Sequence, residues 1–236
     1  MNMNMNETCI RLRMLAGRLL RLLGLRRDPR AFVTRARGVI HIGANDGQER
    51  DFYAKNGLEV LWIEALPEVF DRLQANLKDF PQQQAVCALV TDVTDEEVEF
   101  HVANNSQHSS SLFPMQAHKI LFPDIEFTHT VKLRTIKLAD LLEREGVRLD
   151  RYDTLVLDVQ GAELLVLRGA GRCLHHFQFV MLEAADCQAY QGACLLGELD
   201  VYLKQQGFRQ AGRHGVIHKR GTGTYYDVLY SNVQHR

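Results

Sequence analysis

Residues 38–47 carry the sequence GVIHIGANDG, and residues 61–64 carry LWIE. The first segment is typical of an apolar strand that ends in a glycine-containing turn. The second is typical of an apolar strand that ends on an acid, Glu64, 21 positions after Gly43. Such a turn lets a ligand approach the backbone N–H groups at a helix N-terminus, and the acid can accept hydrogen bonds from two ribose hydroxyls. The spacing therefore predicts a nucleotide site on a parallel α/β sheet.

The turn departs from the dinucleotide-binding pattern G-x-G-x-x-G, because only Gly43 matches a glycine of that frame. Asn45 and Gln48 stand where glycine normally lets a pyrophosphate reach the backbone and lets the helix pack close to the strand. This disfavours an NAD(P)-dependent oxidoreductase, which stays open as an alternative function. A Rossmann-like binding protein without catalytic activity is the second alternative.

A second segment, residues 153–170, has the sequence DTLVLDVQGAELLVLRGA and again indicates a strand, a polar turn and a helix. Together with residues 41–45 and 109–112, it resembles the FkbM family of S-adenosylmethionine-dependent methyltransferases. The resemblance spans roughly residues 39–183. The chain departs from the family pattern at Gln160, where the family usually has glutamate. Glutamine keeps the shape and the hydrogen bonding of that side chain but loses its charge.

The resemblance implies the Rossmann-like fold of a class I methyltransferase, with S-adenosylmethionine as cofactor. It also implies methylation of a hydroxyl on a sugar, a glycan intermediate or a polyketide-like metabolite. We expect Asp158 to be the catalytic base, with His108 as the alternative, because a methyltransferase must sometimes remove a proton from its acceptor. The residues expected to bind the cofactor are Gly43, Ala44, Asn45, Asp46, Glu64, Ala65 and Ala88. Those expected to contact the substrate are Ser109, Ser110, Ser111 and Glu163.

The order of expected elements indicates a doubly wound, mostly parallel sheet closed by an antiparallel hairpin. Ligands bind beyond the carboxyl ends of the strands in such a sheet. We therefore expect the residues at those ends to converge on one crevice. The expected strands are 39–42, 60–63, 85–90, 97–102 (antiparallel), 130–135, 155–158 and 179–183, with a hairpin at 216–218 and 227–230. The expected helices are 47–56, 67–77, 138–145, 161–167 and 194–206, and 104–124 is expected to be a long loop.

The N-terminal residues 1–37 are expected to form an arm separate from the methyltransferase domain at 38–236. Residues 11–37 contain nine arginines and one acid, whereas the formal net charge of the whole chain is -1. Leucines recur on one face of this segment, at helical spacing. One interpretation is a helix that caps the domain, and the other is an interfacial helix that contacts anionic lipid or an acidic partner. No apolar run approaches the ~20 residues that cross a bilayer.

From the remaining composition we expect a cytoplasmic protein, peripheral to the membrane if the basic arm contacts lipid, and we expect several classes of site to be absent. The five cysteines form no C-x-x-C pair, which favours reduced thiols. No metal site is expected, because the histidines and cysteines lack zinc-ligand spacing. The near-neutral net charge gives no argument for binding nucleic acid. A small-molecule or glycan acceptor is the expected partner.

Overall fold

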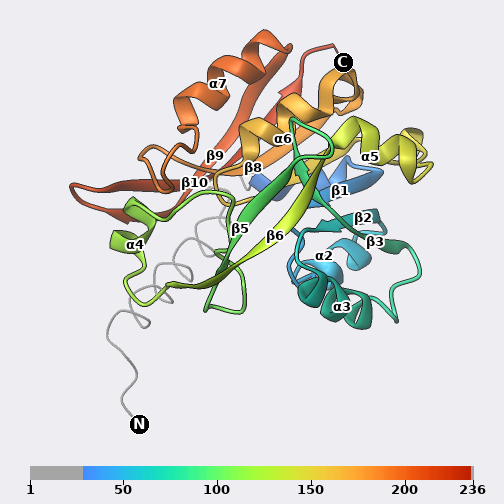
Figure 1. Ribbon diagram of the computed structural model, residues 1–236. Helices are drawn as coiled ribbons and strands as arrows, with labels where there is room; N and C mark the ends of the chain where they lie inside the picture. The colour runs from blue at the N-terminus through green and yellow to red at the C-terminus, as the bar shows by residue number, and fades with distance from the viewer. Residues whose placement is uncertain (1–28, 235–236) are drawn as a thin grey trace.

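The computed structural model describes residues 29–234 and contains a central seven-stranded sheet in the order β3-β2-β1-β7-β8-β10-β9 (Figure 1). The first five strands in this order pair in parallel, and β10 pairs antiparallel with both β8 and β9. This confirms the doubly wound sheet with a closing hairpin. The strands are β1 (Gly38–Ile42), β2 (Glu59–Glu64), β3 (Gln83–Cys87), β7 (Thr154–Leu157), β8 (Phe179–Ala185), β9 (Phe208–Lys219) and β10 (Gly223–Asn232).

The strand order reverses between β1 and β7. From β1 the chain winds outward through β2 and β3 on one side, and from β7 it winds through β8 on the other. This reversal leaves a crevice beyond the carboxyl ends of β1 and β7, which is where ligands bind in doubly wound sheets. The residues that follow these two strands are therefore the first candidates for a site.

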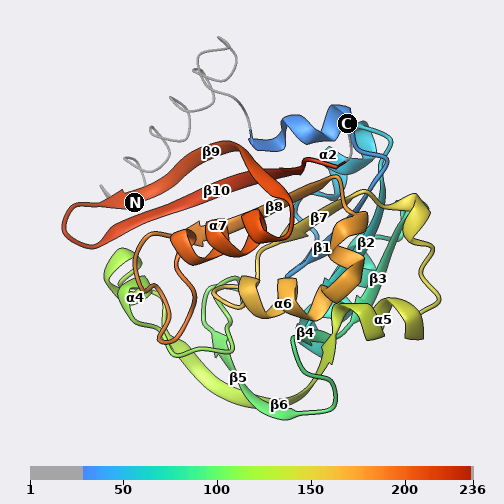
Figure 2. The same ribbon diagram turned by 90° about the horizontal axis from the view of Figure 1, so that it is seen from above.

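Helices cover both faces of the sheet, which explains why its central strands are buried throughout. One face packs on α5 (Leu138–Arg144), α6 (Glu163–Ala170) and α7 (Leu196–Gln205). The other packs on the 3₁₀ helix η1 (Pro29–Thr34), α2 (Arg50–Lys55) and α3 (Pro67–Asn76). Figure 2 shows these two layers on opposite sides of the strands. Two short 3₁₀ helices, η2 (Leu149–Arg151) and η3 (Gly171–His176), complete the connections.

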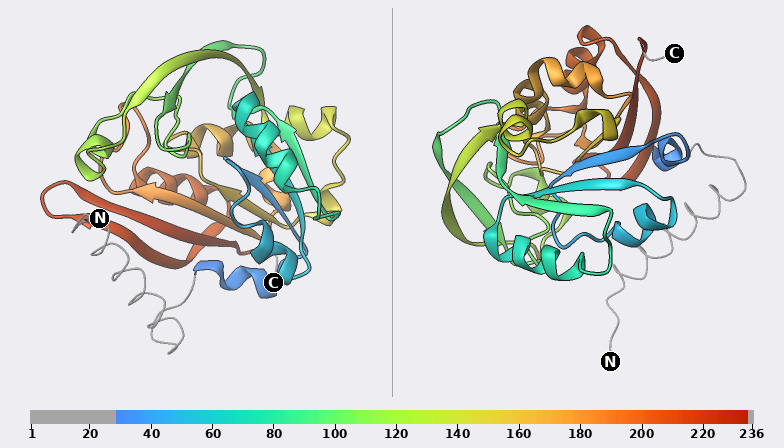
Figure 3. Two further views of the ribbon diagram at one scale, coloured as in Figure 1. Left: turned by 90° about the horizontal axis from the view of Figure 1, so that it is seen from below. Right: turned by 90° about the vertical axis from the view of Figure 1, so that its right-hand side faces the viewer.

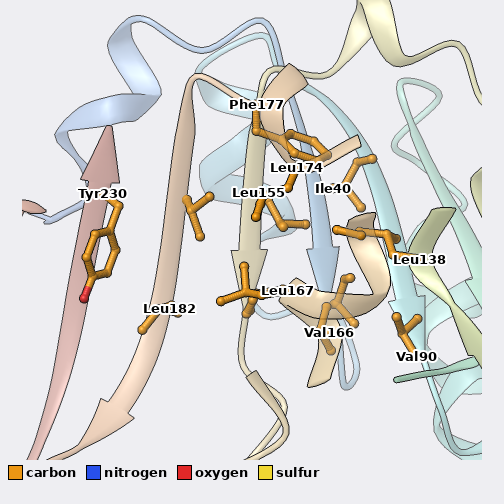
Figure 4. Packing of buried hydrophobic residues seen from close by; sticks show 14 of the residues in the cluster. Ile40, Val90, Leu138, Leu155, Val166, Leu167, Leu174, Phe177, Leu182 and Tyr230 are labelled. Atoms are coloured by element: carbon orange, nitrogen blue, oxygen red, sulfur yellow. The ribbon is translucent and has the colours of Figure 1, made fainter. Parts of the chain in front are cut away.

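Side chains alternate between the two faces, as the two-residue period of a strand requires. Ile40 of β1 packs in the cluster that contains α6, whereas its neighbour Val39 packs in the cluster that contains η1. Figure 4 shows Ile40, Leu155 and Leu182 from three neighbouring strands beside Val166 of α6. The apolar run at 38–42 therefore fills both halves of the core and holds the turn that follows it.

The third expected strand, residues 85–90, is wrong as a single element. It is divided between β3 and a separate strand β4 (Leu89–Thr91), which joins a three-stranded sheet with β5 (Glu97–Ala103) and β6 (Phe127–Lys137). The backbone N–H of Ala88 still bonds to the carbonyl of Glu64 at 2.8 Å, where β2 ends. Beyond that point β4 pairs with β6 instead. The expected antiparallel strand at 97–102 is confirmed as β5.

The long loop at 104–124 contains a short helix, α4 (Ala117–Leu121). Two isolated bridges, His101 with Ser111 and Met115 with Tyr190, connect this segment to β5 and to the segment after β8. The closing hairpin is also longer than expected, because β9 and β10 pair along 12 and 10 residues respectively. Both differences extend the walls around the carboxyl ends of the central strands.

The end of the basic arm packs on the domain. Phe32 and Val33 of η1 are buried. The 3₁₀ helix η1 itself lies against β9 and β10, as Figure 3 shows. The backbone N–H of Arg37 donates to the Asp153 carboxylate at 3.0 Å, and its guanidinium pairs with the same group. The expected membrane or partner contact falls mainly on residues 11–28, outside the described residues, and stays a prediction. None of the helices in residues 29–234 is long and apolar enough to cross a membrane.

Candidate functional site

Two cavities meet at the carboxyl ends of β1 and β7. The wider one has a volume of about 420 Å³ and extends toward α2, α4 and the hairpin. The other is a narrower cleft that extends toward the ends of β2 and β3. The residues that line both are Gly43, Asn45, His108, Asp158 and Gln160. We call these residues the shared floor. Two molecules, one bound in each cavity, would contact each other there.

The turn after β1 is shaped by Gly43 and Asn45, which have φ angles of 83° and 44°. The N–H groups of Gly43 and Ala44 both donate to the carbonyl of Ile63, which ties the turn to β2. A Cβ atom on Gly43 would overlap the backbone carbonyl of Asp158. Only glycine therefore lets the ends of β1 and β7 approach this closely.

Asp46 lies outside both cavities, unlike the other residues expected to bind the cofactor. Its N–H bonds to the Asn45 side chain at 2.8 Å, and its carbonyl accepts a hydrogen bond from Asn76 of α3 at 2.8 Å. Asp46 thus supports the turn from behind, and its expected contact with the cofactor stays a prediction. Gly43, Ala44 and Asn45 line the cavities as expected.

Glu64 lies on the floor of the narrow cleft with its carboxylate held by two backbone N–H groups. Oε2 accepts the Asn45 N–H at 2.8 Å, and Oε1 accepts the Leu66 N–H at 2.9 Å. Burial raises the pKa of this carboxyl, and the backbone hydrogen bonds act in the opposite direction. Each oxygen of an ionised carboxylate has a second lone pair, so both can still accept a ligand hydroxyl.

The rest of the narrow cleft is mostly apolar. Ala65 and Ala88 lie beside Glu64, as the sequence predicts for the cofactor contact. The remaining apolar walls are Ile42, Ile63, Leu89, Val90, Phe100, Leu112, Val159 and Ala162. A carboxylate beside apolar walls suits a nucleoside, because the diol of its ribose needs hydrogen-bond acceptors and the faces of its base need apolar contacts. The residues present therefore fit the adenosyl group of S-adenosylmethionine.

Asp158 follows β7 and lines both cavities. Part of the Asp158 side chain is accessible to solvent in the cavity. The surrounding protein atoms still displace much of the water around the carboxyl, and this burial raises its pKa to about 6. The side-chain amide of Gln160 donates to Asp158 Oδ1 at 2.6 Å and to Glu183 Oε2 at 3.2 Å. Burial, followed by the charge of Asp158, raises the pKa of Glu183 as well. The site therefore contains two neighbouring carboxyls joined by one amide.

Glu163 lies behind the Gln160 turn and lines neither of these two cavities. Its Oε1 accepts the N–H of Gly161 at 3.2 Å, and burial raises its pKa to about 7. It lines a small third cavity beside Tyr190 and Glu183. Glu163 therefore supports the turn from the interior, and its expected contact with the acceptor stays a prediction.

The three serines are fixed parts of a buried loop. Ser109 lines the wide cavity and bonds to His118 at 3.2 Å, while Ser110 lines the narrow cleft and accepts the Ala103 N–H at 3.1 Å. Ser111 is fully buried, and its hydroxyl donates to the backbone carbonyl of Gln160 at 2.7 Å. Ser111 thus fixes the Gln160 turn and lines neither cavity, and its expected contact with the substrate stays a prediction.

Residues 106–108 lie at the shared floor, to which His108 itself belongs, and hydrogen bonds to three side chains hold them there. Asn45 donates to the carbonyl of Ser106 at 3.2 Å, and Arg72 of α3 donates to the Gln107 side chain at 2.7 Å. Gln48 bonds to His108 Nδ1 at 2.9 Å. We call residues 106–108 the bridging loop, because they connect the wall of one cavity to the wall of the other.

Sequence reasoning missed two buried histidines of the wide cavity. His118 stacks on Tyr190 at 4.9 Å and bonds to the Tyr225 hydroxyl at 3.0 Å, and burial lowers its pKa to about 4. His41 stacks on Trp62 at 4.8 Å, and burial lowers its pKa too. Both rings are therefore neutral walls near neutral pH. No local sequence signal marks them, because tertiary packing alone creates these contacts.

Comparisons with known proteins show the family of the chain. A model of the methyltransferase FkbM domain matches residues 41–210. The 2-O-methyltransferase NoeI of Sinorhizobium fredii is 24% identical over 162 residues, which cover 65% of this chain and 65% of that protein. The chain thus spans about two thirds, 65%, of the length of this curated relative.

Solved methyltransferase structures are also similar to the chain. Magnesium protoporphyrin IX methyltransferase from Synechocystis, with bound S-adenosylmethionine, aligns with a TM-score of 0.47 and 12% identity over 83% of this chain and 69% of that one. A TehB-like S-adenosylmethionine-dependent methyltransferase from Corynebacterium glutamicum aligns with a TM-score of 0.42 and 11% identity over 96% of this chain and 99% of that one.

Proposed function

We propose that this chain, which belongs to the FkbM family of S-adenosylmethionine-dependent methyltransferases, transfers the methyl group to a hydroxyl oxygen of a polyhydroxylated acceptor. The observation that supports this most is the shared floor of the two cavities. The narrow cleft suits the adenosyl group, and the wide cavity opens from the same floor at Asp158. A donor and an acceptor in these cavities would be adjacent.

The cofactor contributes a methyl group on a positively charged sulfur, which becomes a neutral thioether after transfer. In this proposal Glu64 binds the ribose diol, Ala65 and Ala88 contact the base, and the turn after β1 binds the amino-acid part. The protein's remaining tasks are to orient the acceptor, exclude water and accept its proton.

The wide cavity suits a hydroxylated ring better than an acidic one. Its floor contains the carboxyls of Asp158, Glu183 and Asp227, which accept hydrogen bonds from hydroxyls and repel anions. Its walls include the aromatic rings of Phe52 and Tyr225, against which the apolar face of a sugar can pack. The name of the NoeI relative supports oxygen as the methylated atom. A sugar, a glycan intermediate or a polyketide-like metabolite has these features.

A binding and product assay tests the proposal. Calorimetry should show S-adenosylmethionine binding to the full-length chain and no NAD binding. Mass spectrometry of candidate glycosides and polyols incubated with enzyme and cofactor should then show one added methyl on oxygen. A methyl group found on nitrogen or carbon of the preferred acceptor would overturn the oxygen assignment while leaving the methyltransferase family intact.

We expect Glu64→Ala to weaken S-adenosylmethionine binding by about tenfold to a hundredfold, because charge-assisted hydrogen bonds to the ribose diol are lost. Calorimetry measures the effect, and a melting curve checks that the variant is folded, since Glu64 also holds two backbone N–H groups. The matched control is Glu68→Ala, an exposed acid on α3 that should leave the affinity unchanged. An unchanged dissociation constant in folded Glu64→Ala would remove Glu64 from the cofactor site.

A further inference from the structure

Three acids occupy adjacent positions across three neighbouring strands. Leu157 of β7 is in register with Leu182 of β8, so the next residues, Asp158 and Glu183, lie beside each other. Glu183 is in turn the register partner of Asp227 on β10. Cross-strand partners point to the same side of a sheet. The three carboxyls therefore form a row, and all of them line the wide cavity.

The side-chain amide of Gln160 makes two carboxyls of this row, Asp158 and Glu183, unequal. The hydroxyl of Tyr190 donates to Gln160 Oε1 at 2.7 Å, so the amide nitrogen must face the carboxyls. This nitrogen donates to Asp158 at 2.6 Å and to Glu183 at 3.2 Å. A shorter hydrogen bond withdraws more electron density from its acceptor, which makes Asp158 the weaker base of the two.

The two carboxyls also face different ligands. Asp158 lines the cofactor cleft as well as the wide cavity, whereas Glu183 and Asp227 do not line the cleft. A cationic cofactor stabilises the ionised form of the nearer carboxylate, Asp158. The neighbouring negative charges of Asp158 and Asp227 act on Glu183 in the opposite sense and favour its taking up a proton.

We propose that Glu183 is the general base of the reaction, that Asp158 stays ionised at the cofactor, and that Gln160 positions both carboxyls. The inference rests on the proposed hydroxyl acceptor. As the acceptor oxygen forms its bond to the methyl carbon, its O–H bond breaks and the proton passes to Glu183. The carbon–sulfur electron pair stays on the sulfur, so charge balances. Glu183 then releases the proton to water through the wide cavity.

This assignment predicts the direction of the pH dependence. A base must first lose its own proton, so methyl transfer should rise as pH rises through the pKa of Glu183. That pKa is raised by burial first, and then by the charges of Asp158, Asp227 and Glu163. The other titratable groups around it include the phenols of Tyr190 and Tyr225 and the thiols of Cys187 and Cys194, which line a small cavity together with Glu183. Burial is the largest cause that raises the pKa of each of these four groups. The phenols therefore stay neutral over the range of the measurement.

The test uses Glu183→Gln and Asp158→Asn in the full-length chain, with Glu99→Gln on the exposed face of β5 as the control for charge removal. Calorimetry with S-adenosylmethionine measures the affinity for the cofactor. The rate of methyl transfer is measured at saturating cofactor, with a panel of methyl glycopyranosides as acceptors. We expect Glu183→Gln to lower the rate of methyl transfer by about 10²- to 10⁴-fold and to leave the affinity for the cofactor nearly unchanged. Asp158→Asn should mainly weaken cofactor binding, and Glu99→Gln should change neither.

An infrared difference spectrum between wild type and Glu183→Gln gives a readout that needs no acceptor. It should contain a protonated-carboxyl band that persists to higher pH than the carboxyl of an ordinary glutamate. In Asp158→Asn this band should disappear at lower pH, because one neighbouring negative charge is gone.

Two results would overturn the assignment of Glu183. One is a rate of methyl transfer in Glu183→Gln that is within about threefold of the wild-type rate. Loss of a general base should lower that rate by at least about 10²-fold. The other is a Glu183 carboxyl that is already ionised at acid pH. If wild type binds the cofactor but methylates no glycoside oxygen, the proposed acceptor class fails instead, and the infrared band decides the assignment of Glu183 on its own.

Discussion

Gly43→Ala is expected to destabilise the protein by about 3–5 kcal/mol and to abolish measurable S-adenosylmethionine binding. The residue has a φ angle of 83°, and its new Cβ would overlap the backbone carbonyl of Asp158. The turn can accept the methyl group only if the ends of β1 and β7 separate. That separation would widen the shared floor and move Asn45 away from Glu64. Urea denaturation and calorimetry measure the two effects.

Gly57→Ala is the matched control for this change. Gly57 also has a positive φ angle, 69°, but no atom lies within 4 Å of a Cβ built there. The cost should therefore be only the strain of the left-handed backbone, about 1–2 kcal/mol, with cofactor binding retained. Equal destabilisation by the two substitutions would mean that backbone strain, and not the contact with Asp158, requires glycine at position 43.

Gly169→Ala is expected to destabilise the protein by about 2–4 kcal/mol although alanine is the better helix former. A Cβ atom on Gly169 of α6 would overlap the backbone carbonyl of Thr91 at the end of β4. The helix and the strand must then move apart. Because β4 begins directly after Ala88, we also expect weaker cofactor binding through the base-contacting wall. Chemical denaturation and calorimetry check both expectations.

Gly197→Ala in α7 is a control for which we expect the opposite change in stability. No atom lies within 4 Å of a Cβ at this position, so alanine should stabilise the helix by about 0.5–1 kcal/mol. A stabilising Gly169→Ala would show that α6 does not need this close approach to β4.

The local signals at residues 38–64 were sufficient to predict the two strands and the turn that form one end of the narrow cleft. The apolar strand, the positive-φ glycine and the terminal acid are all encoded within a few residues, and each lies where the pattern places it. The division at Ala88 could not be predicted in the same way. It depends on where β6 runs, more than 40 residues later in the chain, and single-sequence periodicity contains no information about that pairing.

The acceptor side of the site was harder to predict for the same reason. Glu183 is the last residue of the strand expected at 179–183, but its relation to Asp158 and Asp227 follows only from the register of three strands. Ser111 has a side chain suited to a polyol, yet the bridge to His101 turns it into the interior. Residue type predicted which groups could do chemistry, and long-range pairing decided which of them face the cavity.

The bridging loop connects the two proposed ligand sites, so we expect binding at one site to depend on binding at the other. Residues 106–108 are fastened to the turn after β1 and to α3, and they contribute to the walls of both cavities. If cofactor binding favours one arrangement of this loop, that arrangement is the one the acceptor meets. Linkage then requires that the acceptor strengthen cofactor binding by the same factor by which the cofactor strengthens acceptor binding. Loss of the Arg72 hydrogen bond to Gln107 should reduce both factors together.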